Sequence, residues 1–161
     1  MRRRIAFTVM AAVCIGLVAA CTPTLELDPA ETTVEYSFRD NSVPPRYHRS
    51  YIIQASETEA SITVDSYGDV LRQETAAMPA ETWAKVIGMA GTLPQRTQDI
   101  AAPKPGCAGG SASRIIIRDG GKERYSKSAE NCGGRTDAPL TDTAAAIEGL
   151  FDMDDLLKTD G

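Results

Sequence analysis

Hydrophobic and polar residues alternate over much of 33–73, which is the pattern of strands that bury one face. In the first run, Val34, Tyr36 and Phe38 fall on one side with period two. The clearest alternation covers 60–65, where apolar and polar positions exchange at every step. Further strands are predicted at 49–55 and 70–73, so three or four antiparallel strands come first.

The spacing of apolar residues becomes helical from residue 79 onward. Pro79 takes the first helical position, where a missing N–H is tolerated, and Glu81 lies near the positive end of the helix dipole. An apolar face at i, i+3, i+4 and i+7 is formed by Trp83, Val86, Ile87 and Ala90. Gly91 and Pro94 are predicted to end this helix, residues 95–112 to form a loop, and a last helix to cover 141–151.

Between these helices, Asp119-Gly120-Gly121 separates two short strand patterns and predicts a β-hairpin. Asp-Gly favours a hairpin because both central positions of a type I′ turn need a positive φ. Two registers stay open. A two-residue Asp-Gly loop would put Cys107 directly opposite Cys132. A three-residue loop would instead pair Ile115 with Tyr125, and we prefer it for packing.

Strands, a helix, a hairpin and a second helix in this order predict the α+β class. We expect an antiparallel sheet of about five or six strands with two packed helices and one disulfide. The predicted division is a signal peptide over 1–20, an acidic, proline-containing tether over 21–33, a single globular domain over 34–157 and a tail over 158–161.

The first 21 residues carry a different pattern. Three arginines at 2–4 precede an apolar run over 5–20, and Cys21 follows directly. As a helix this run spans roughly 24 Å, short of the ~20 residues that a transmembrane helix usually needs. The small residues 18–20 before Cys21 resemble the lipobox of a bacterial lipoprotein signal peptide, whose cysteine is acylated and begins the mature chain. An ordinary secretory signal cut at the same bond is the alternative.

The four cysteines favour the lipoprotein interpretation. Cys14 would leave with the signal and Cys21 would carry the lipid. Cys107 and Cys132 then remain as a pair for a disulfide in an oxidising compartment. Ordinary secretion would leave one exported thiol unpaired. The disulfide would close a loop of about 25 residues and stabilise the domain by roughly 3 kcal/mol.

Charge limits the partners. The chain has 17 basic and 22 acidic residues, and loss of the three signal arginines leaves 14 against 22, a formal net charge of −8. The negative electrostatic field of such a chain would repel polyanions, so we expect it to bind neither nucleic acid nor, through charge, anionic lipid. Membrane attachment must then come from a lipid on Cys21, for which a diacylglyceryl group suffices.

Residues with catalytic or metal-binding chemistry are few. His48 is the only histidine and no Gly-x-Ser-x-Gly motif presents a nucleophile, so we expect no catalytic residue. One histidine and a committed cysteine pair do not make a usual zinc site, so we expect no metal and no cofactor. Asp152, Asp154 and Asp155 lack the glycine and final glutamate of a calcium loop and are interpreted as a solvated helix end.

Cations and aromatic residues cluster around the stiff connector 43–45 in this otherwise acidic chain. Arginine and tyrosine often anchor interfaces because they bury large areas and keep directional donors. An envelope protein or an anionic glycan could dock there; the alternative is that alternate residues of a strand face solvent. The candidate binding patch is Arg39, Arg46, Tyr47, His48, Arg49 and Tyr51.

Several segments resemble a group of small uncharacterised bacterial envelope proteins. They are 42–51 (SVPPRYHRSY), 64–71 (VDSYGDVL), 107–110 (CAGG) and 132–134 (CGG). The group's cysteine motif usually has Thr or Ser at the position of Ala108. The resemblance spans 34–151 and implies an envelope location and a disulfide, but it supplies no catalytic residue.

Together these observations predict a lipid-anchored bacterial envelope protein, periplasm-facing or on the surface, that acts as a binding or scaffolding module. Thr22 rather than Asp follows the cysteine, which by resemblance to Gram-negative lipoproteins implies the outer membrane. Its partners would be the membrane, through the lipid, and an envelope protein or glycan, but no nucleic acid. The alternatives are a small periplasmic enzyme, with His48 beside a carboxylate in a deep cleft, or an enzyme inhibitor, with a protruding rigid loop at 43–45.

Overall fold

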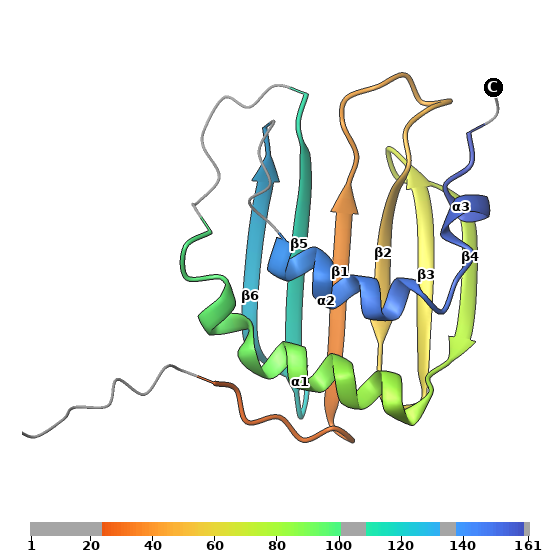
Figure 1. Ribbon diagram of the computed structural model, residues 1–161. Helices are drawn as coiled ribbons and strands as arrows, with labels where there is room; N and C mark the ends of the chain where they lie inside the picture. The colour runs from red at the N-terminus through yellow and green to blue at the C-terminus, as the bar shows by residue number, and fades with distance from the viewer. Residues whose placement is uncertain (1–23, 101–108, 133–137, 160–161) are drawn as a thin grey trace, which may run out of the picture.

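The computed structural model describes residues 24–100, 109–132 and 138–159, and these form one six-stranded sheet with helices across one face (Figure 1). The first four strands form a meander: β1 (Thr32–Arg39), β2 (Ser50–Ala55), β3 (Glu59–Ser66) and β4 (Asp69–Ala77). Helix α1 (Ala80–Arg96) then leads to the hairpin of β5 (Ser111–Asp119) and β6 (Lys122–Asn131). The chain continues through α2 (Ala138–Glu148) and the short α3 (Met153–Leu156).

Strand β1 lies inside the sheet because it pairs with both β2 and β5. Val34 faces Ala55 on one side and Ile117 on the other. The strand order is β4-β3-β2-β1-β5-β6, and every neighbouring pair is antiparallel. The predicted α+β class, with an antiparallel sheet and packed helices, is therefore confirmed.

The core lies between the sheet and the helices. Alternate residues of β1, β2 and β3 are buried, as the period-two patterns predicted, and Tyr36, Ile53 and Ile62 have at most 1% of their surface exposed. Trp83 of α1 and Ile147 of α2 close the core from the other side. Each such side chain stabilises the fold by about 1.5–3 kcal/mol.

The prediction that Gly91 and Pro94 end the first helix is wrong, because α1 continues through both. Gly91 serves close packing: its carbonyl accepts the Leu25 N–H at 2.9 Å, and a Cβ there would lie 3.2 Å from the Leu25 carbonyl oxygen. Pro94 costs about 3 kcal/mol inside a helix. Burial of the adjacent Leu93, together with the 3.0 Å bond from the Thr97 N–H to the Leu93 carbonyl, offsets that cost. The last predicted helix, 141–151, is also shifted, since α2 begins and ends earlier.

Residues 24–31, here called the N-terminal segment, belong to the folded domain, so the predicted tether is wrong over this range. Leu25 and Leu27 pack against the core. The indole N–H of Trp83 donates to the Pro29 carbonyl at 3.0 Å. The two leucines form an apolar edge that acidic neighbours obscure in the sequence.

Both predicted hairpin registers are wrong. Gly120-Gly121 forms the two-residue loop, with φ of 57° and 73°, and Asp119 faces Lys122. Two glycines adopt the left-handed positions at less cost than an Asp-Gly pair. A bulge near the turn then sets Ile117 opposite Tyr125.

Several predictions concern residues outside the described part of the chain. The signal peptide over 1–20, the lipidated Cys21 and the disulfide partner Cys107 all fall there. The lipid and the Cys107–Cys132 disulfide therefore stay predictions. In the described ranges, no helix is both long and apolar enough to cross a membrane.

Candidate functional site

The β1–β2 loop, residues 40–49, extends past the end of the sheet (Figure 1). Its tip, residues 43–47, contains the predicted stiff connector, and all four residues from Pro44 to Tyr47 are exposed. The Arg46 guanidinium lies 4.5 Å from the centre of the Tyr47 ring, a cation–π contact. The loop tip therefore presents a planar cation and an aromatic ring to solvent as one unit.

Hydrogen bonds hold the loop tip although it is exposed. A 2.8 Å backbone bond closes a turn within it. The Ser66 hydroxyl donates to the Pro45 carbonyl at 2.8 Å, and the Tyr67 hydroxyl donates to the Val43 carbonyl at 2.6 Å. A loop fixed in this way has little conformational entropy left to lose when it binds a partner.

Tyr67 has a strained backbone. Among the described residues it is the only non-glycine residue with a positive φ, 55°, in a two-residue turn completed by Gly68 at 96°. A side chain in that region costs about 1–2 kcal/mol. The ring stacks on His48 with centroids 3.9 Å apart and 21° between planes. Strain that is held by specific contacts is typical of functional sites.

His48 is a buried support under this turn, with 3% of its surface exposed. Its Nε2 lies 3.3 Å from the Ser50 hydroxyl, and its buried Nδ1 has no hydrogen-bond partner in the described part of the chain. The nearby Asp40 carboxylate accepts the backbone N–H of Asn41 at 2.7 Å and of Arg49 at 3.0 Å. His48 borders the cavity beside the loop, but only 3% of its surface is exposed, whereas a catalytic base must reach its substrate. Its stacking and burial therefore favour a packing role.

The six patch residues do not share one surface. Arg46 and Tyr47 are exposed on the loop tip, whereas Arg39 is exposed on β1, 3.8 Å from Glu130. Arg49 donates from Nε and Nη2 to the Lys158 carbonyl at 3.2 and 3.1 Å, so it ties the loop to the C-terminal segment. The residues free to bind a partner are therefore a subset of the predicted patch.

Tyr51 belongs to the core rather than to the patch. Strand β2 begins at Ser50, which puts Tyr51 in phase with Ile53. Its hydroxyl donates to Glu148 Oε1 at 2.7 Å, and its ring centre lies 5.3 Å from that of Phe38. Burial, and then the Glu148 carboxylate, raise the pKa of Tyr51 far above its ordinary value.

A cavity of about 560 Å³ lies where the loop meets the sheet. This volume is within the range of small-molecule sites. Its lining mixes polar and apolar groups, because Ser37, Asp40, Asp65 and Tyr67 lie beside Phe38 and Ile52. Three residues of the predicted patch, Arg39, His48 and Tyr51, also border this cavity. Ser37, Asp65 and Tyr67 could not be predicted as site residues, because only the pairing of β1, β2 and β3 brings them together. The Tyr67-Gly68 turn was the one local signal.

The aspartates near the C-terminus form a helix start. They are exposed, as predicted, but Asp152 caps α3 by accepting the Asp155 N–H at 3.0 Å. Asp155 also pairs with Arg72 at 2.6 Å. Within the described ranges, no group of three or more His, Cys, Asp or Glu side chains is arranged to hold a metal ion.

No family model, curated protein or solved structure matches the chain. The site is therefore defined by the geometry of this chain alone. Its main features are an exposed loop tip held by hydrogen bonds and the cavity beside it.

Proposed function

We propose that the protein is a lipid-anchored bacterial envelope protein that acts as a binding module. The loop tip and the adjacent cavity form its binding site, and the ligand is an envelope protein or a glycan. The observation that carries this proposal is the exposed Arg46–Tyr47 pair on a backbone held by Ser66 and Tyr67. Arginine and tyrosine on a pre-organised loop bind with a small loss of entropy.

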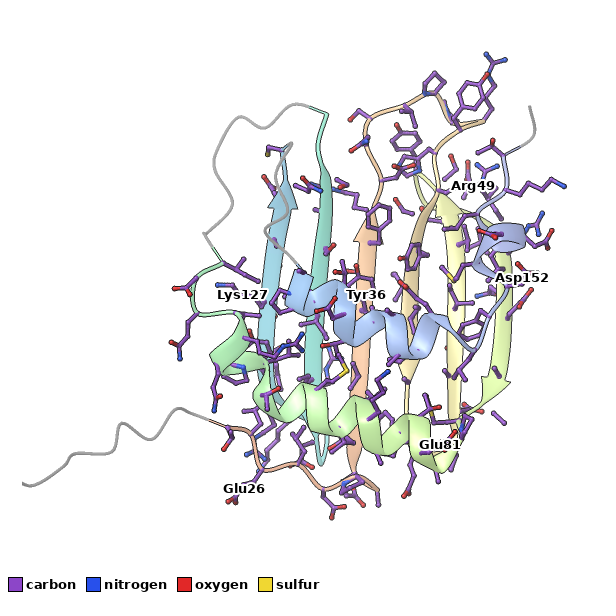
Figure 2. All side chains as sticks on the ribbon, in the orientation of Figure 1. Glu26, Tyr36, Arg49, Glu81, Lys127 and Asp152 are labelled. Carbon is purple, nitrogen blue, oxygen red and sulfur yellow. The ribbon has the colours of Figure 1, made fainter. Side chains whose placement is uncertain are left out.

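The position of the N-terminal segment indicates how the domain would be oriented relative to the membrane. Only residues 22–24 separate Cys21 from Leu25, which is bonded to α1. With a lipid on Cys21, this end of the domain lies within roughly 10–14 Å of the bilayer surface. Figure 2 shows Glu26 and Arg49 at opposite ends of the molecule. The loop tip then faces away from the membrane, where a partner can reach it.

We also propose the Cys107–Cys132 disulfide. Ser111, four residues after Cys107, faces Asn131 across the β5–β6 hairpin, which supports Cys107 as the partner. Peptide mapping without reduction tests the pairing: a linked pair of peptides is expected, and a free thiol at either position contradicts it.

An enzyme inhibitor is the second candidate function. The exposed prolines of the loop tip give it the rigid, protruding form that can enter an enzyme cleft. The partner would then be one enzyme, and its activity would fall on binding. A small periplasmic enzyme is the third possibility: His48 borders the cavity together with Asp40 and Asp65, but only 3% of its surface is exposed.

Photo-crosslinking in cells tests the binding site. A photoreactive amino acid replaces Arg46 in one variant and Lys85, exposed on α1, in a matched control. We expect a discrete protein adduct, or retention on cell-wall glycan, from position 46 alone. Equal adducts from both positions, or none from position 46, would contradict the proposal.

The anchor has a separate test. Mass spectrometry of the native N-terminal peptide is expected to show a diacylglyceryl group on Cys21. An unmodified sulfur would refute the lipid and leave the crosslinking result to stand by itself.

A further inference from the structure

The two outer edges of the sheet are protected unequally. Strand β6 carries five charged side chains in ten residues, and charge of this kind keeps edge strands from pairing. Strand β4 carries three in nine, with no lysine and no proline. Two of its apolar residues are well exposed, Val70 at 59% and Leu71 at 44%. The β4 edge is therefore the one open to another strand.

The outer edge of β4 has no hydrogen-bonded neighbour in the described part of the chain. Its outward N–H and C=O groups are consequently free to continue the sheet. A bulge at Leu71 interrupts the pairing with β3, but Arg72–Ala77 pairs regularly with β3 at every position. This run is long enough to form a strand pair.

We propose that β4 pairs antiparallel with β4 of a second copy of this chain, so that the two sheets join across a twofold axis at Gln73. In that register Arg72 of each copy faces Glu74 of the other. Both residues lie on the side of the sheet that the helices cover, since they face Val64 and Ile62 of β3. The symmetry produces the Arg–Glu pair twice, and opposite charges that face each other across strands stabilise the pairing.

Charge also selects this register over its neighbours. Moving the axis by one residue sets either Glu74 or Arg72 against its own copy, and like charges directly opposite are destabilising. The existing 2.6 Å pair between Arg72 and Asp155 does not block the new contact. A guanidinium has five N–H donors and can hold both carboxylates.

Cysteine crosslinking of the purified full-length chain in mild detergent tests the pairing. Gln73→Cys places a thiol on the proposed axis, where paired Cα atoms lie about 4.5–5.5 Å apart, within reach of a disulfide. Thr75→Cys is the matched control, exposed on the same face of the same strand. Its two copies would be roughly 13 Å apart along the strands, too far to bond.

We expect an oxidised dimer from Gln73→Cys and monomer from Thr75→Cys. Equal crosslinking of both would mean random collision within a micelle and would overturn the proposal. A monomeric Gln73→Cys would also overturn it, and would leave the edge to an extended peptide of another protein.

Charge reversal tests the register. In the Gln73→Cys background, Arg72→Glu and Glu74→Arg should each weaken dimer formation about tenfold, and the double reversal should restore it. Circular dichroism of each variant confirms the fold. Single reversals without effect, or a double reversal that fails to restore the dimer in a folded protein, would refute the Arg–Glu pairing.

Discussion

Replacing Tyr51 by Phe should destabilise the protein, although its sequence neighbours place Tyr51 in a surface patch. The hydroxyl donates a 2.7 Å hydrogen bond to Glu148, which joins β2 to α2. The substitution keeps the ring, so it removes one hydrogen bond to a carboxylate, worth about 1.5–3 kcal/mol. Glu148 is only half-buried and regains water. We therefore expect the lower end, about 1.5 kcal/mol.

Alkaline pH separates this bond from general packing. Burial and the Glu148 carboxylate raise the pKa of Tyr51 in the folded state above its ordinary value of 10.0. As the pH rises above about 10, the unfolded chain releases this proton before the folded one does. The contribution is fully present below pH 10, and above it the free energy of unfolding falls by about 1.4 kcal/mol per pH unit. Tyr51→Phe lacks this slope, so the two curves should converge above pH 10.

Urea unfolding followed by the fluorescence of Trp83, the single tryptophan, measures both effects at pH 7 and from pH 9 to 11. Tyr47→Phe is the control, because Tyr47 is 41% exposed on the loop tip. It should change stability by no more than about 0.5 kcal/mol. Equal losses for Tyr51→Phe and Tyr47→Phe at pH 7, or identical slopes above pH 10 for Tyr51→Phe and the unchanged protein, would refute the placement of Tyr51.

Four further substitutions probe other parts of the fold. Asp152→Ala removes the cap of α3 and should lower the free energy of unfolding, measured with a chemical denaturant, by about 1 kcal/mol. An unchanged free energy of unfolding would show that the cap does not stabilise the protein. Two glycines should respond with opposite signs: Gly88→Ala, exposed in α1 with open space around it, should stabilise by about 0.5–1 kcal/mol. Gly121→Ala, at φ 73°, should destabilise by about 1–2 kcal/mol. If both alanine substitutions changed the free energy of unfolding in the same direction, the left-handed conformation of Gly121 in the turn would be contradicted. Trp83→Phe loses the bond to the N-terminal segment, whose amide hydrogens should exchange faster; unchanged exchange would show that other contacts hold it.

The strands could be predicted because each buries one face. Val34 and Tyr36, and later Ile62 and Val64, alternate with polar residues, and the sheet keeps that period. The end of α1 could not be predicted in the same way. Local propensity placed a stop at Gly91 and Pro94, but tertiary packing of the N-terminal segment and of Leu93 outweighs it.

The candidate site was only half visible in the sequence. The loop tip was found because its prolines, Arg46 and Tyr47 are contiguous. The supports of the tip come from elsewhere: Ser66 and Tyr67 lie at the far end of β3, and only the pairing of β2 with β3 brings them beneath the loop. Tyr51 was misplaced although the predicted strand 49–55 contained it, because the neighbouring Ile52 and Ile53 are both apolar and leave open which face of the strand is buried.

The claim that a pre-organised loop tip binds the partner is tested most directly through Tyr67. Tyr67→Phe keeps the ring on His48 and removes the 2.6 Å bond to the Val43 carbonyl, so it loosens the tip without changing its exposed surface. The protein carries a photoreactive residue at position 46, and the yield of its adduct in cells is compared between the form that keeps Tyr67 and the form with Tyr67→Phe. We predict about a fivefold lower yield with Phe, which corresponds to the loss of one hydrogen bond. An unchanged yield at equal protein levels would contradict the account.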